Sequence, residues 1–254
     1  MPASIKLQEE YGDDLAIIFV ESQGTSPAAT AKFIMKQRWF GNQAMWTNEA
    51  PFRTGTKGLP NFALLSADGK VIATGNHMTS KDRDLIDEEI KNAKAAPADT
   101  NKSFKKAWKE FNKGNYAKAM AEASKVGAKE AELAEEATSI TELFEDRIQA
   151  NLNRVTWLLD NGFPGDAKDR LDGLVSGLKG TDRLLAAANE IVERFDSDEM
   201  KLELEAAGKI ERLLEKVYED GKDEKLFGKL SKLATEYSST KVGARAQKIA
   251  ALGS

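Results

Sequence analysis

The stretch Leu15-Ala16-Ile17-Ile18-Phe19-Val20 decides the fold that we expect for the first part of the chain. It is continuously apolar and rich in β-branched residues, which is typical of a short strand covered on both faces in a parallel sheet. Pro27 then suits the first position of a helix, where its missing N–H costs nothing. Thr25 or Ser26 can accept a hydrogen bond from that first turn. The sequence therefore predicts a strand followed by a helix over residues 27–39.

Strand and helix signals continue to about residue 95. Residues 44–47 have the pattern of a second strand. Residues 61–66 and 70–74 are two more strand-like runs, separated by an Ala-Asp-Gly turn, so we expect them to form an antiparallel hairpin. A threonine and a serine at 79 and 80 can each cap a final helix of residues 81–95.

The composition changes at Ala95-Ala96-Pro97-Ala98-Asp99-Thr100, a stretch of small residues that is typical of a linker. Beyond it Pro164 is the one remaining proline, and apolar residues follow helical spacing throughout. We therefore predict an α/β domain in residues 1–96, a linker in residues 97–102 and an all-helical domain in residues 103–254.

The composition excludes several kinds of chemistry. The chain of 254 residues has no cysteine, so disulfides, thiolate metal sites and cysteine nucleophiles are impossible. Its single histidine, His77, argues against histidine-based zinc sites and serine–histidine triads. A formal net charge of -4 does not favour nucleic acid as a partner, and no apolar run approaches the roughly 20 residues that span a bilayer. We expect no catalytic residue, no cofactor, no metal and no membrane insertion.

Two segments of the first domain resemble the active-site segments of the thioredoxin family. Thr25-Ser26-Pro27-Ala28 follows the apolar strand, where that family has a cysteine, two residues often ending in proline, and a second cysteine. Residues 55–62, which include Leu59-Pro60, are similar to the segment that leads into the family's cis-proline, and Asp68-Gly69-Lys70-Val71 to its closing hairpin. The resemblance implies a central mixed sheet flanked by helices, with Pro60 cis and close to residues 25–28.

The resemblance is to a redox-inactive member, because attack on a disulfide requires a thiolate and the chain has none. The family also holds extended peptides with the backbone beside its cis-proline, in the manner of strand addition. The resemblance therefore implies a peptide-binding groove between Leu59-Pro60 and residues 25–28. The alternative is that these residues serve only the fold, with the hydroxyls of Thr25 and Ser26 capping a helix.

Two segments of the second domain resemble tetratricopeptide repeats. The first contains Ala107-Trp108 and the run Gly114-Asn115-Tyr116-Ala117-Lys118-Ala119-Met120, and the second lies in residues 230–249. In such repeats small residues let two helices approach closely and large residues fill the gaps. The copies are irregular and show no strict period, so a plain helical bundle is the alternative. The resemblance implies a binding face near Trp108 and Tyr116.

We predict a non-catalytic interaction or scaffold protein with a protein or peptide partner. Two alternatives share its architecture: a glutathione transferase-like enzyme, in which Ser26 or Thr25 would activate the glutathione thiol, and a redox-independent chaperone. Thr74-Gly75-Asn76 stands where glutathione transferases usually have an acidic residue and a serine, which argues against the enzyme. The residues predicted to contact the partner are Thr25, Ser26, Pro27, Ala28, Leu59, Pro60, Trp108 and Tyr116.

The expected localisation follows from the same resemblance. Thioredoxin-like domains joined to helical repeats resemble exported bacterial proteins. The abrupt start Met1-Pro2-Ala3-Ser4 would suit a mature form whose signal peptide has been removed. We therefore expect an exported or periplasmic protein.

Overall fold

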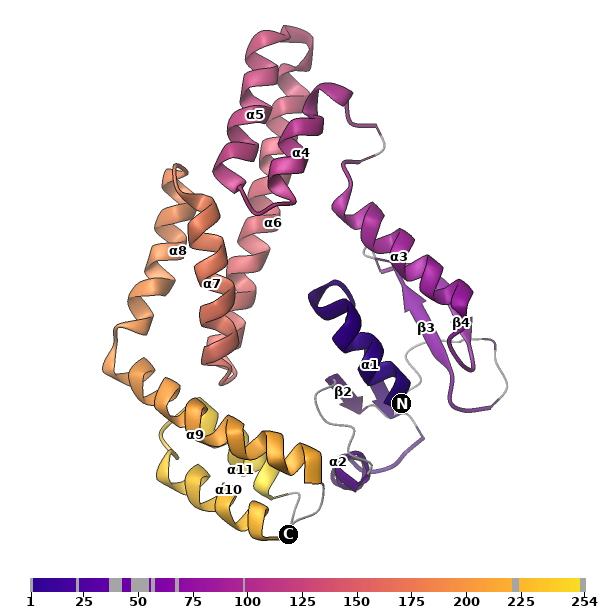
Figure 1. Cartoon of the computed structure of the whole chain (residues 1–254), viewed down its shortest axis with the longest axis vertical. Helices are drawn as coiled ribbons and strands as arrows, with labels where there is room; N and C mark the ends of the chain where they lie inside the picture. The colour runs from indigo at the N-terminus through magenta and orange to yellow at the C-terminus, as the bar shows by residue number, and fades with distance from the viewer. Residues whose placement is uncertain are drawn as a thin grey trace. The chain divides into compact units, whose positions relative to one another are not determined.

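The computed structural model describes residues 2–21, 23–36, 43–46, 55, 58–66, 69–97, 99–220 and 224–251 (Figure 1). The chain is mostly helical and divides into two compact units. The division falls between Ala95 and Ala96, except that residues 218–220 are grouped with the first unit.

The first unit contains short strands and three α-helices. Strand β1 pairs with β2 in parallel, with Ile18 opposite Gln43, and β3 pairs with β4 antiparallel, with Phe62 opposite Gly75. The second pairing confirms the predicted hairpin, although residues 67 and 68 of its turn lie outside the described residues. The elements are α1 (Pro2–Tyr11), a 3-10 turn (Gly12–Asp14), β1 (Ile18–Glu21), α2 (Pro27–Lys36), β2 (Gln43–Trp46), β3 (Phe62–Leu65), β4 (Val71–Gly75) and α3 (Ser80–Lys94).

The start of α2 agrees with the sequence. The helix begins at Pro27, and the Ser26 hydroxyl oxygen accepts a hydrogen bond from the Ala29 N–H at 3.3 Å. This confirms the predicted first position and the predicted cap. The expected last turn, residues 37–39, lies outside the described residues, as does residue 47 of the second strand.

The described strands do not join into the single central sheet that the thioredoxin resemblance implies. They form two separate two-stranded sheets. Ile18 and Val20 of β1 are 50% and 37% exposed, so the prediction that this strand is covered on both faces is wrong. An apolar run of this length favours a strand, but which faces are covered depends on neighbours far along the chain.

Helices α1 and α3 of the first unit each bury an apolar side chain and are linked by polar contacts. Leu7 is 3% exposed and Ile86 is 2% exposed. Polar contacts link Tyr11 with Asp87 at 2.8 Å, Glu10 with Arg83 at 3.1 Å and Asp14 with Lys94 at 2.5 Å. The start of α3 is fixed by Asp82, whose carboxylate accepts the Thr79 N–H at 2.7 Å. That hydrogen bond holds the pKa of Asp82 below its usual value.

From residue 102 onward, the described residues form helices and turns without a strand. Neighbouring helices pack as hairpins, α4 with α5, α6 with α7 and α10 with α11, which is the predicted all-helical character. The α-helices are α4 (Lys105–Phe111), α5 (Tyr116–Lys129), α6 (Ala134–Asp160), α7 (Pro164–Leu178), α8 (Asp182–Phe195), α9 (Asp198–Asp220), α10 (Glu224–Glu236) and α11 (Lys241–Ala250), with 3-10 turns at Lys102–Phe104 and Ala131–Leu133.

The second unit buries its apolar side chains in two groups. The first group, here called the bundle core, joins α4 to α8 and ends at Met200 in α9. Phe144 is fully buried in it, with its ring centroid 4.9 Å from that of Trp108 and 4.2 Å from that of Phe111. The second group, here called the cap core, lies on α9, α10 and α11, and its side chains are not members of the bundle core: Ala206, Ala207, Ile210, Leu214, Val217, Phe227, Leu230, Ala234, Val242 and Ala246.

A buried carboxylate fixes the start of α11. Glu203 of α9 is 4% exposed, and its two oxygens accept the N–H groups of Lys241 at 2.6 Å and Val242 at 3.0 Å. The Thr240 hydroxyl accepts the next N–H, that of Gly243, at 2.9 Å. The first three N–H groups of α11 therefore all have acceptors, which a helix cannot provide for itself.

Replacing Glu203 with alanine should lower the free energy of unfolding by about 1–3 kcal/mol, because a buried and a partly buried N–H group lose their acceptor. Urea denaturation followed by circular dichroism measures the loss. Glu215→Ala is the matched control, since Glu215 is an exposed acid on the same helix. A loss at Glu215 as large as that at Glu203 would show that the hydrogen bonds to α11 contribute nothing.

Candidate functional site

The first candidate site is the loop that precedes β3. The Leu59–Pro60 peptide bond is cis, as predicted. Leu59 is 61% exposed, and its neighbours Gly58 and Pro60 are exposed too. The loop therefore presents an apolar side chain to solvent.

Asn76 holds this loop in place. It follows β4 directly, and the pairing of Phe62 with Gly75 brings the end of β4 beside the start of β3. Its side-chain amide donates to the Pro60 carbonyl oxygen at 3.1 Å and to the Gly58 carbonyl oxygen at 3.4 Å. One side chain thus bonds the backbone on both sides of Leu59, which limits how far the loop can change shape.

The second predicted segment, residues 25–28, is exposed throughout. The Ser26 carbonyl oxygen accepts the Thr30 N–H at 2.9 Å, in addition to the hydroxyl's bond with Ala29. Both acceptors of Ser26 therefore serve the first turn of α2. The predicted proximity of Pro60 to residues 25–28 stays a prediction.

Trp108 does not lie on a binding face. Its side chain is buried, with 3% exposed, and its ring packs edge-on against Phe144 and Phe111. The prediction that Trp108 contacts a partner is therefore wrong, because the ring is enclosed in the bundle core. Helical spacing identifies which residues share a face, but not whether a neighbouring helix covers that face.

Tyr116 is half-buried at the start of α5. Its ring centroid lies 5.2 Å from that of Phe111, and burial raises the pKa of its hydroxyl. Beside it, buried Glu110 accepts the Asn115 side-chain amide at 2.8 Å and pairs with Lys118 at 3.1 Å. These two partners lower the pKa of Glu110. The Glu110 contacts tie α4 to the start of α5. Tyr116, beside them, is only partly accessible to a partner.

Sequence reasoning missed the role of Asn76. The run Thr74-Gly75-Asn76 argues against a glutathione transferase, but it does not by itself predict these hydrogen bonds. A signal was nevertheless present, because an asparagine placed just after the second hairpin strand lies opposite the residue before the first. Its side chain can then bond the backbone of the preceding loop.

The described residues show neither a metal-binding cluster nor a helix that could cross a membrane. They contain no cluster of three or more histidine or acidic side chains placed to hold a metal ion. Within the same ranges, no helix combines the length and the apolar character that crossing a membrane requires.

Comparison with known proteins does not extend this picture. No protein-family model matches the chain, and no match is found among curated proteins or solved structures.

Proposed function

We propose that the chain is a non-catalytic, thioredoxin-like binding protein whose first unit holds a protein or peptide partner at the Leu59-Pro60 loop. The observation that carries the proposal is Leu59 itself, which is 61% exposed on a loop bonded by Asn76. The helical unit acts as the scaffold to which this binding unit is attached.

An exposed leucine on a constrained loop is well suited to binding. Burying a leucine side chain against a partner contributes about 1.5–3 kcal/mol. A loop that already has its bound shape loses less conformational freedom on association. An extended peptide is the partner that fits best, because exposed loop backbone beside a strand can bond to it while Leu59 fills an apolar contact.

Leu59→Asp should weaken binding at least ten-fold, because it places a charge where an apolar contact forms; burial of a leucine corresponds to about this factor. The peptide is first selected from a displayed library of extended sequences on the unchanged protein. Its dissociation constant is then measured by fluorescence anisotropy for each variant.

Val71→Asp is the matched control, since Val71 is an apolar side chain of the same unit with 47% exposed. It should leave the dissociation constant unchanged. Equal weakening by both substitutions, or by neither, would rule out the Leu59 loop as the binding surface. Titration with glutathione tests the enzyme alternative separately. Measurable binding of glutathione that the selected peptide does not compete away would favour a glutathione-dependent activity.

A further inference from the structure

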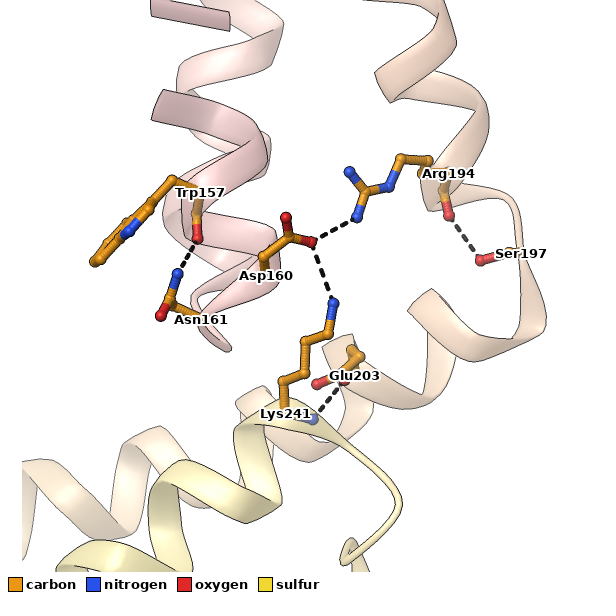
Figure 2. A network of polar contacts seen from close by, with 7 residues as sticks. All are labelled: Trp157, Asp160, Asn161, Arg194, Ser197, Glu203 and Lys241. Atoms are coloured by element: carbon orange, nitrogen blue, oxygen red, sulfur yellow. Dashed lines mark hydrogen bonds and ion pairs between the residues drawn. The ribbon is translucent and has the colours of Figure 1, made fainter. Parts of the chain in front are cut away.

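The bundle core and the cap core meet at the end of α6 and the turn that follows it, residues 160–163. The backbone of Gly162 lies close to α11, since a Cβ there would stand 2.9 Å from the Lys241 carbonyl oxygen, and several other contacts at this junction involve charged side chains. Asp160, at the end of α6, accepts Arg194 of α8 at 3.1 Å and Lys241 of α11 at 3.2 Å (Figure 2). Asp160 and Lys241 are about half exposed, at 51% and 43% of their side-chain area. Ion pairs that solvent reaches are weakened by salt.

A second contact at the junction joins a cation to an aromatic ring. The guanidinium of Arg245 in α11 lies 4.1 Å from the ring centroid of Phe163, and the same side chain pairs with Glu211 of α9 at 3.3 Å. Phe163 packs against the bundle core and stacks on Trp157, with centroids 6.2 Å apart. Arg245 therefore covers an aromatic ring that belongs to the other core.

Docking at this junction also has a cost. The Nε and Nη1 atoms of Arg245 are buried without a hydrogen-bond partner in the described part of the chain. Donors that leave water and find no acceptor oppose burial. Docking thus combines partly exposed ion pairs, which salt weakens, with the burial of an arginine that leaves two of its donors without a partner.

The first turn of α9 provides the pivot. The Ser197 hydroxyl donates to the Arg194 carbonyl oxygen at 2.7 Å, a contact visible in Figure 2, and accepts the Met200 N–H at 3.1 Å. Met200 is buried in the bundle core. The beginning of α9 therefore stays attached while α11, at the other end of the chain, can separate.

We propose that α9–α11 forms a cap that docks on the α6–α7 turn through the Asp160–Lys241 and Arg245–Phe163 contacts and undocks when salt screens them, uncovering Phe163. The cap turns about the first turn of α9, where Met200 stays in the bundle core. The cap core is preserved in both arrangements, since Glu203, Thr240 and the apolar side chains that hold α11 all lie within the cap.

Because the chain has no cysteine, introduced cysteines are its only thiols and can be labelled specifically in the full chain. Cysteines introduced at Glu190 of α8 and Lys248 of α11, both exposed, carry nitroxide labels whose separation reports docking. Between about 0.1 M and about 1 M salt the screening length falls from about 10 Å to about 3 Å. At low salt we expect mainly one label distance. At high salt we expect a second, longer distance, and its population should increase with the salt concentration.

Asp160→Asn and, independently, Lys241→Met should each raise the ratio of the longer to the shorter distance about two- to five-fold at low salt. Lys241→Met keeps the backbone N–H that bonds Glu203. The matched control is Asp172→Asn, which removes the Lys168–Asp172 pair, at 3.1 Å and similarly exposed, within α7. One unchanging distance in all variants and at both salt concentrations, or an equal change in Asp172→Asn, would overturn the proposal.

Discussion

Replacing Gly177 with alanine is expected to destabilise the helical unit by at least about 3 kcal/mol, at the upper end of overpacking effects. Gly177 lies on α7, and a Cβ there would stand 1.9 Å from the Gly114 carbonyl oxygen and 2.7 Å from a ring carbon of Tyr116. Gly114 is in the turn between α4 and α5, with φ +78°. Because the nearest atom belongs to the backbone, the α4–α5 turn must move away from α7 to make room.

Gly173 provides the control for this prediction. It lies one helical turn earlier on α7, and a Cβ there meets nothing within 4 Å. Gly173→Ala should therefore be neutral or stabilising by up to about 1 kcal/mol, the ordinary gain from replacing glycine inside a helix. Urea denaturation of both variants compares them directly. Similar stability of the two would mean that α7 does not approach the α4–α5 turn this closely.

Local features of the fold could be predicted from the sequence. Pro27 preceded by a serine indicates a helix start by the chemistry of two residues, and the structure has that start. The Asp68-Gly69 turn similarly indicates the hairpin of β3 and β4, because the neighbouring runs are apolar. In both places the deciding interactions lie within a few residues of one another.

Features that depend on distant partners could not be predicted. The exposure of Ile18 and Val20 depends on which segments cover β1, and a continuous apolar run does not identify them. The burial of Trp108 depends on α6, whose Phe144 is 36 positions away by the numbering. A tryptophan in a repeat-like motif fits a core or a binding face equally well until the packing of that helix is known.

In the candidate site, too, a local feature could be predicted and contacts between distant residues could not. The cis Leu59–Pro60 bond was predicted, because a proline-containing loop before a hairpin strand has a recognisable sequence. The bonds from Asn76 were missed because they join positions 16 and 18 residues apart. The junction at Asp160 was missed for the same reason, since its partner Lys241 is 81 residues away.

Phe144→Ala is expected to lower the free energy of unfolding by about 4 kcal/mol, within the range for a fully buried phenylalanine. The side chain has no exposed area and lies between two aromatic neighbours, stacked on Phe111 at 4.2 Å and edge-on to Trp108 at 4.9 Å. Its removal leaves a cavity that both neighbours line. Phe144→Leu keeps much of the volume and should lose about half as much.

Urea denaturation measures these losses, and near-ultraviolet circular dichroism reports whether Trp108 stays fixed beside the cavity. Val192→Ala on α8 is the control, since Val192 is 36% exposed and its truncation should cost well under the loss at Phe144. An equal loss at both positions would contradict a core centred on Phe144. Because Trp108 contacts this ring, any substitution of Trp108 disturbs folding as well. A loss of partner binding in a Trp108 variant therefore says nothing about a surface unless its stability is shown to be unchanged.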